Sequence, residues 1–129
     1  MLDRGPSPEE DPVLAWPVHA DAVQRLLDGS QAATRFQHPR AGEMPLPDAI
    51  DRFYTTDVFL HTWDLARATG QAERLDPQTC ADLLAEMAPI EERMRSSGHY
   101  GPPVPVPEDA DVQTRLLGFI GRDPLCGSG

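Results

Sequence analysis

The sequence predicts an all-α protein of about four helices, and three observations support this fold class. Apolar residues recur at helical spacing in four stretches, and helix-starting and helix-ending residues bound these stretches. Strand-like alternation is almost absent. We expect a flexible lead-in over residues 1–11, a helical bundle domain over 12–124 and a tail over 125–129.

The first helix is expected over residues 17–28, where apolar residues keep helical spacing before a glycine. The following stretch, 31–44, has no clean period and predicts either a short extended piece or an irregular loop. A long second helix should then run from Pro47, which suits a first helical turn, to Gly70, which suits a helix end.

The third helix should start at Asp76, an N-cap residue followed by Pro77. Pro89 interrupts this helix and should kink it or split it in two before Gly98 ends it. After it, the proline-rich stretch over residues 100–107 predicts an extended segment packed along the surface.

The last helix is expected from about Glu108 or Asp109 to Ile120, with Gly121 as its cap. No internal repeat and no change in composition divide the chain, so the sequence predicts a single domain.

The chain is strongly acidic, with a formal net charge of −10 and a pI near 4.6. This charge argues against nucleic acid or an anionic membrane as a partner. No apolar run has the length of a membrane span, and the first residues lack a signal-peptide core. Cys80 and Cys126 have no metal-binding or disulfide spacing, so we expect a cytoplasmic protein.

The expected second helix carries the residues with the most chemical interest. Counting about 100° per residue places Asp57 and His61 on one face, inside an apolar stripe that includes Tyr54 and Leu65. A buried carboxylate needs a compensating partner. That partner could be a divalent metal, or the pair could simply be hydrogen-bonded to each other or to a basic residue.

Asp64 lies near the edge of the same stripe and has two possible roles. It could orient His61 by accepting a hydrogen bond, or it could bind an arginine or cap a helix. Trp63 falls on a different face and is expected in the core or an interface. The other three histidines are expected at the surface: His19, His38 and His99.

Three blocks of sequence resemble a known family. They are F-L-H-T-W-D-L-A-R-A-T-G (59–70), Y-G-P-P-V-P-V-P-E-D-A (100–110) and L-L-G-F-I-G-R-D-P (116–124). Together they resemble the actinobacterial metal-binding proteins of the DinB superfamily, which are related to the N-terminal domain of mycothiol-dependent maleylpyruvate isomerase. The resemblance implies a DinB-like four-helix bundle that holds a divalent metal, zinc or nickel, with Asp57 and His61 as ligands.

The chain departs from that family in one respect. The family's first part, a C-x-G-W-like segment and a helix with a further histidine ligand, has no match, so the bundle is expected to be shortened at its N-terminus. Catalytic zinc normally takes three protein ligands. Either the site is lost, or His19, Asp64 or a second subunit supplies the missing ligand. An uncovered apolar groove would also favour a homodimer.

Two functions remain open at this point. In the first, a metal on Asp57 and His61 takes part in a thiol-linked isomerisation or transfer, with mycothiol as the small-molecule cosubstrate. In the second, the chain is a non-catalytic helical bundle or dimeric interaction module that has lost the complete metal site.

Overall fold

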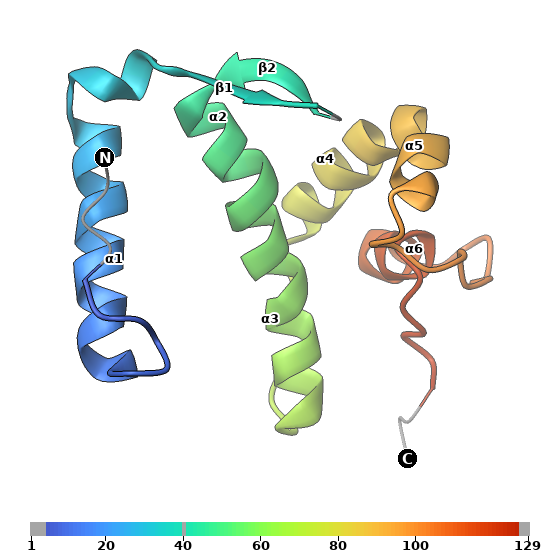
Figure 1. Ribbon diagram of the computed structural model, residues 1–129. Helices are drawn as coiled ribbons and strands as arrows, with labels where there is room; N and C mark the ends of the chain where they lie inside the picture. Colours follow the sequence, from blue (N-terminus) through green and yellow to red (C-terminus); the bar gives the residue numbers. More distant parts are fainter. Residues whose placement is uncertain (1–4, 40, 127–129) are drawn as a thin grey trace. The chain divides into compact units, whose positions relative to one another are not determined.

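The computed structural model describes residues 5–39 and 41–126, and most of them are helical (Figure 1). The mainly-α fold class is therefore confirmed. In chain order the helices are α1 (Pro12–Asp28), α2 (Leu46–Ile50), α3 (Thr56–Ala68), α4 (Pro77–Met87), α5 (Glu91–Ser96) and α6 (Val112–Phe119).

The chain divides into two structural units, unit 1 (Met1–Leu60) and unit 2 (His61–Gly129). The prediction of one domain over residues 12–124 stays a prediction. Of the expected lead-in and tail, residues 1–4 and 127–129 lie outside the described part of the chain.

Helix α1 begins at Pro12, earlier than the predicted start at Pro17. The Asp11 side chain accepts a hydrogen bond from the backbone N–H of Leu14 at 3.0 Å and so caps the helix. Pro17 lies inside the helix. The predicted start is therefore wrong, because Asp11 and Pro12 form a stronger start signal than a later proline. The predicted end at Asp28 is confirmed.

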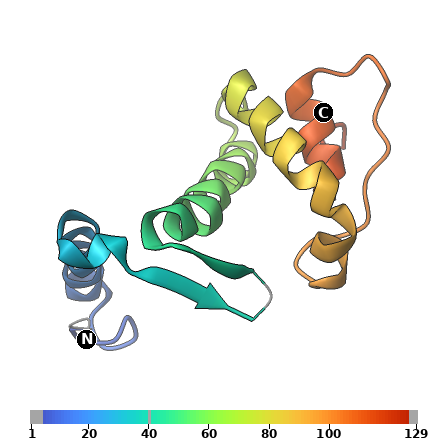
Figure 2. The same ribbon diagram turned by 90° about the horizontal axis from the view of Figure 1, so that it is seen from above.

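The stretch without a clean period contains an antiparallel hairpin of β1 (Arg35–His38) and β2 (Gly42–Pro45), visible in Figure 2. Phe36 pairs with Met44 across the hairpin, and both side chains are half-buried. The Phe36 ring also lies against Phe53, with the two ring centroids 6.1 Å apart. Of the two possibilities left by the sequence, the extended piece is the correct one.

A π-helical turn, Asp51–Thr55, connects α2 to α3. The predicted helix over 47–70 is thus a run of helical backbone with one irregular turn. Gly70 follows α3 with a φ of 67°, a conformation that suits glycine, so the predicted end is confirmed. Hydrogen bonds in a π turn span five residues, so this turn holds more residues than an α-helical turn.

In unit 2, α4 begins as predicted. The Asp76 carboxylate accepts a hydrogen bond from the backbone N–H of Thr79 at 2.8 Å. Pro89 lies in a 3₁₀ turn between α4 and α5, which confirms the predicted interruption. Gly98 follows α5 with a φ of 79°, which confirms the predicted end.

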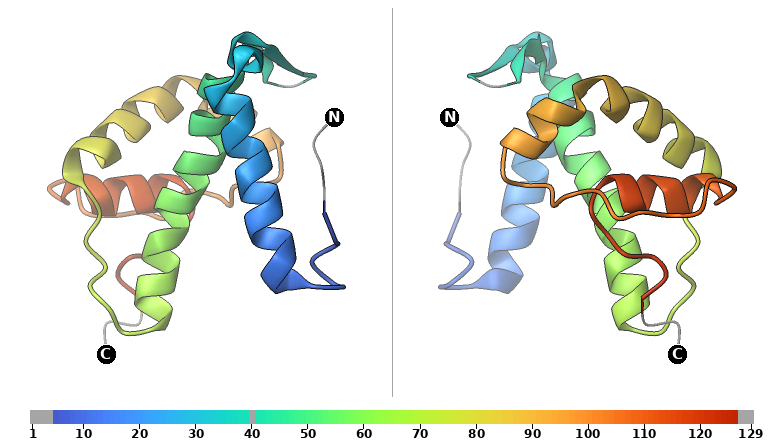
Figure 3. Two further views of the ribbon diagram at one scale, coloured as in Figure 1. Left: turned by 90° about the vertical axis from the view of Figure 1, so that its left-hand side faces the viewer. Right: turned by 90° about the vertical axis from the view of Figure 1, so that its right-hand side faces the viewer.

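Helix α6 begins at Val112, later than predicted. The Asp111 side chain caps it by accepting a hydrogen bond from the backbone N–H of Thr114 at 2.7 Å. Residues 108–110 form a turn instead of helix, so the predicted start is wrong. Residues 101–107 are extended, as predicted, and they run beside α6, which the sequence did not predict (Figure 3).

The two units differ in how much apolar side chain they bury. In unit 2, α4 packs against α6, and the buried residues are Trp63, Ala66, Leu75, Cys80, Met87, Met94, Leu116, Leu117 and Ile120. The buried apolar residues described in unit 1 are mostly small: Ala15, Ala22, Ala49 and Leu60. Most of the large apolar side chains that are exposed also belong to unit 1: Val13, Leu14, Trp16, Phe53, Tyr54 and Val58.

Candidate functional site

Asp57 and His61 lie four residues apart on α3, and both residues are exposed. Their expected orientation toward the interior is not observed. Tyr54 and Leu65, from the same predicted stripe, are also exposed, at 71% and 65% of their surface. The role of Asp57 and His61 as metal ligands stays a prediction.

The buried face of α3 is the one that carries Leu60, Trp63 and Ala66. This confirms the expectation that Trp63 belongs to the core. Burying an indole and an isobutyl group removes a large apolar area from water, whereas burying a carboxylate requires a paired charge. The face with the larger apolar side chains and without acids is therefore the face that is buried.

His61 contacts Asp64 one turn later on α3. The Nδ1 atom of His61 lies 2.8 Å from Oδ2 of Asp64, which is hydrogen-bonding distance. The two roles considered for Asp64 prove to be compatible, because this carboxylate also binds an arginine. Arg122 donates from Nε to Oδ1 at 2.8 Å and from Nη2 to Oδ2 at 2.7 Å.

The ion pair is partly shielded from water, since the Arg122 side chain is only 22% exposed. The Arg122 hydrogen bonds are the main reason that the pKa of Asp64 is below its ordinary value, and the His61 ring adds a smaller lowering. Partial burial of Asp64 opposes this shift. Asp64 is therefore an ionised acceptor for both neighbours.

Arg67 makes a second connection between α3 and the C-terminal segment (Gly121–Cys126). Its guanidinium lies over the Trp63 ring, 4.9 Å from the ring centroid. It also donates to the backbone oxygen of Pro124 at 3.2 Å and to that of Cys126. Two of the blocks that carry the family resemblance, 59–70 and 116–124, are thus joined through Arg67 and Arg122.

The remaining histidines lie at the surface of the described structure. His19 and His99 are exposed, as expected. His38 is also exposed, and its ring stacks on Phe36 with centroids 6.3 Å apart. Among the residues that the structure describes, no three His, Cys, Asp or Glu side chains gather in a group that could hold a metal ion.

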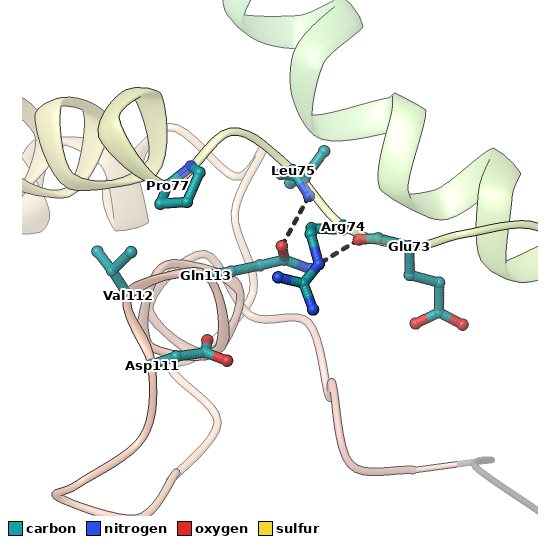
Figure 4. A pocket seen from close by; sticks show the side chains of 7 residues that line it. All are labelled: Glu73, Arg74, Leu75, Pro77, Asp111, Val112 and Gln113. Carbon is teal, nitrogen blue, oxygen red and sulfur yellow. Dashed lines mark hydrogen bonds between the residues drawn. The ribbon is translucent and has the colours of Figure 1, made fainter.

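A surface pocket of about 330 Å³ lies between the loop before α4 and the start of α6 (Figure 4). Its walls are formed by Glu73, Arg74, Leu75, Pro77, Asp111, Val112 and Gln113. The Gln113 side chain accepts from the backbone N–H of Leu75 and donates to the backbone oxygen of Glu73, each at 2.8 Å. Gln113 therefore fixes this loop to α6.

Sequence reasoning missed Arg122 and Gln113. Arg122 belongs to the G-R-D-P stretch that carries part of the resemblance, but no local pattern links it to Asp64, 58 residues earlier. Gln113 gave no signal, because a glutamine on a short amphipathic helix is ordinary.

No helix in the described part of the chain combines the length and apolar character that crossing a bilayer requires.

No protein-family model matches the chain, and no solved structure matches it. The chain is similar to two proteins of Mycobacterium tuberculosis, the uncharacterized protein Rv0738 of strain H37Rv and the uncharacterized protein MT0763 of strain CDC 1551. Each is 39% identical over 96 residues, which cover 73% of this chain and 51% of the relative. The chain thus spans about half the length of the curated relatives it matches.

Proposed function

We propose that this chain is a DinB-like helical module that supplies Asp57 and His61 as ligands to a divalent metal, zinc or nickel. The observation that carries the proposal is the contact between Nδ1 of His61 and Oδ2 of Asp64 at 2.8 Å. Histidines that ligate a metal usually donate their other ring N–H to a carboxylate or a carbonyl, which fixes the orientation of the ring.

The two proposed ligands fit such a metal in chemical type but not in number. A carboxylate and an imidazole suit zinc or nickel. A catalytic zinc site normally needs a third protein ligand, and the described residues provide no group of three. Asp64 is engaged by Arg122 at both oxygens, so it serves better as an orienting acceptor than as the third ligand.

The third ligand is therefore proposed to come from a second copy of the chain. Exposed large apolar side chains favour association, and the described part of unit 1 exposes several: Val13 at 84%, Trp16 at 76% and Val58 at 67%. A symmetric dimer whose interface includes the exposed face of α3 with Asp57 and His61 would bring two copies of each ligand together.

A bound metal would supply Lewis acidity toward a small substrate or a thiol. The substrate class that follows from the family resemblance is a thiol cosubstrate such as mycothiol, in an isomerisation or transfer reaction. The contribution of this chain is to hold the ligand ring of His61 in place through Asp64.

Metal stoichiometry tests the proposal. The purified chain, incubated with excess zinc or nickel and then desalted, should retain metal in elemental analysis, and His61→Ala should abolish that retention. His99→Ala is the matched control, because it removes an exposed histidine from a loop, and it should retain metal like the wild type. Light scattering at micromolar concentration should show a dimer in the metal-loaded sample.

The alternative function is a non-catalytic interaction module. It is favoured by the same lack of a three-ligand group among the described residues and by the exposed apolar side chains of unit 1. A wild-type chain that forms dimers but retains neither metal would support this alternative and contradict the metal proposal.

A further inference from the structure

We infer that Arg122 is a positioning residue for His61, acting through the Asp64 carboxylate and anchored by the C-terminal cap of α6. This inference rests on the proposed function, since it concerns the same imidazole ligand. The C-terminal segment (Gly121–Cys126) lies far from His61 in sequence. Through Arg122 it takes part in orienting the His61 ring.

The first step is the geometry of the ion pair. Arg122 binds both oxygens of Asp64 with two parallel donors, at 2.8 Å and 2.7 Å. A guanidinium is planar and rigid, so this fork fixes the plane of the carboxylate as well as its position. A lysine in the same place could supply the charge but not the two parallel hydrogen bonds.

The second step concerns the His61 ring. Oδ2 of Asp64 faces Nδ1 of His61 at 2.8 Å while it accepts from Nη2 of Arg122. A carboxylate held in an ion pair is an acceptor only, so Nδ1 of His61 must carry the hydrogen. The neutral ring is then the tautomer whose lone pair is on Nε2, the atom that would ligate a metal.

The third step is the anchoring of Arg122 itself. Its backbone N–H donates to the oxygen of Leu117 at 2.9 Å, and the N–H of Gly121 donates to the oxygen of Gly118 at 3.1 Å. With Gly121 at a φ of 89°, this is a Schellman motif at the end of α6. Leu117 is buried, so Arg122 projects from a part of the backbone that is fixed to the core of unit 2.

The test uses the full chain and four proteins: wild type, Arg122→Ala, Arg122→Lys and Arg67→Ala. Arg67 also binds the C-terminal segment but does not contact Asp64 in the described structure, so Arg67→Ala is the matched control. Circular dichroism melts select a temperature at which all four are folded. Zinc affinity is measured by calorimetry, and the tautomer of His61 by ¹⁵N NMR of the metal-free chain.

Loss of Arg122 should weaken zinc binding by up to about tenfold, the lower end of the effect of removing an outer-shell partner of a ligand histidine, because Arg122 acts through Asp64. The NMR spectrum of Arg122→Ala should show a mixture of His61 tautomers, whereas wild type and Arg67→Ala should hold mainly the form protonated at Nδ1. Arg122→Lys should fall between wild type and Arg122→Ala in both measurements.

The inference is overturned if Arg122→Ala leaves the His61 tautomer unchanged, whatever the metal result. Failure of the proposed function looks different: no variant, including wild type, would bind zinc. In that case a tautomer shift in Arg122→Ala would still support the positioning role.

Discussion

The backbone oxygen of Val104 lies 2.7 Å from the point that a Cβ atom would occupy on Gly118. The N–H of Val104 also donates to the oxygen of Gly118 at 2.9 Å, so the two backbones are in direct contact. A Cβ at the same point would lie 2.8 Å from Cγ1 of Val106. The absent side chain at position 118 is what allows the proline-rich segment to pack on α6.

Gly118→Ala should therefore lower the free energy of unfolding by up to about 2 kcal/mol. Alanine is favoured over glycine in a helix by about 1 kcal/mol, but overpacking against a backbone atom costs about 1–3 kcal/mol. Urea unfolding measures the difference. Gly101→Ala is the matched control, since a Cβ there meets nothing within 4 Å, and it should stay within about 0.5 kcal/mol of wild type. Equal stability of the two variants would contradict the close contact.

The N-cap of α6 should make the stability of unit 2 dependent on pH. Hydrogen bonds from Thr114 hold the pKa of Asp111 below its ordinary value of about 4. Because the folded pKa is lowered, the stabilisation is fully present above the unfolded pKa and is lost as the pH falls toward the folded pKa. Melting temperatures between about pH 6 and pH 3 should fall less steeply in Asp111→Asn, which keeps a capping oxygen without the titrating charge. If the melting temperatures of wild type and Asp111→Asn fall equally as the pH is lowered, the Asp111 cap does not contribute to the pH dependence of stability.

The two cysteines should differ sharply in reactivity. Cys80 is fully buried, and burial, followed by the nearby carboxylates of Asp76 and Asp111, raises the pKa of its thiol. Cys126 is exposed. The reactive form of a cysteine is the thiolate, so a buried thiol with a raised pKa reacts slowly. Titration of the native chain with DTNB should therefore detect one rapidly reacting thiol, and titration in denaturant should detect two. In Cys126→Ser the rapid reaction should disappear. Rapid reaction of Cys80 in that variant would show that its surroundings in α4 are open.

The features that could be predicted from sequence are those set by neighbouring residues. Asp76 and Pro77 start α4, Pro89 interrupts the helical run after it, and Gly70 and Gly98 end their helices, because caps and prolines act within one turn. The start of α1 was misplaced although Asp11 and Pro12 repeat the signal seen at Asp76 and Pro77. Pro17 also suits a first helical turn, but it lies inside α1.

The orientation of α3 could not be predicted, for two physical reasons. Asp57, His61 and Leu65 do share one exposed face of α3, but the buried face is the one with Leu60, Trp63 and Ala66. Helical spacing alone does not decide which of two apolar-containing faces is buried. In addition, the partner of Asp64 is Arg122, which follows it by 58 residues. Helical spacing cannot reveal a contact between residues so far apart in sequence, although the blocks 59–70 and 116–124, which contain Asp64 and Arg122, both carry the family resemblance.

The last prediction concerns Gln113, which joins α6 to the loop before α4 with two hydrogen bonds of 2.8 Å, to Leu75 and Glu73. Gln113→Ala leaves a backbone donor and a backbone acceptor without this partner, and Leu75 is buried. The free energy of unfolding in urea should fall by about 1–2 kcal/mol. Gln78→Ala is the matched control, because it removes an exposed glutamine that bonds only within α4, to Asp82, and should cost less than about 0.5 kcal/mol. If the two variants lose the same stability, water replaces the Gln113 contacts without cost, and the packing of α4 on α6 alone holds the loop.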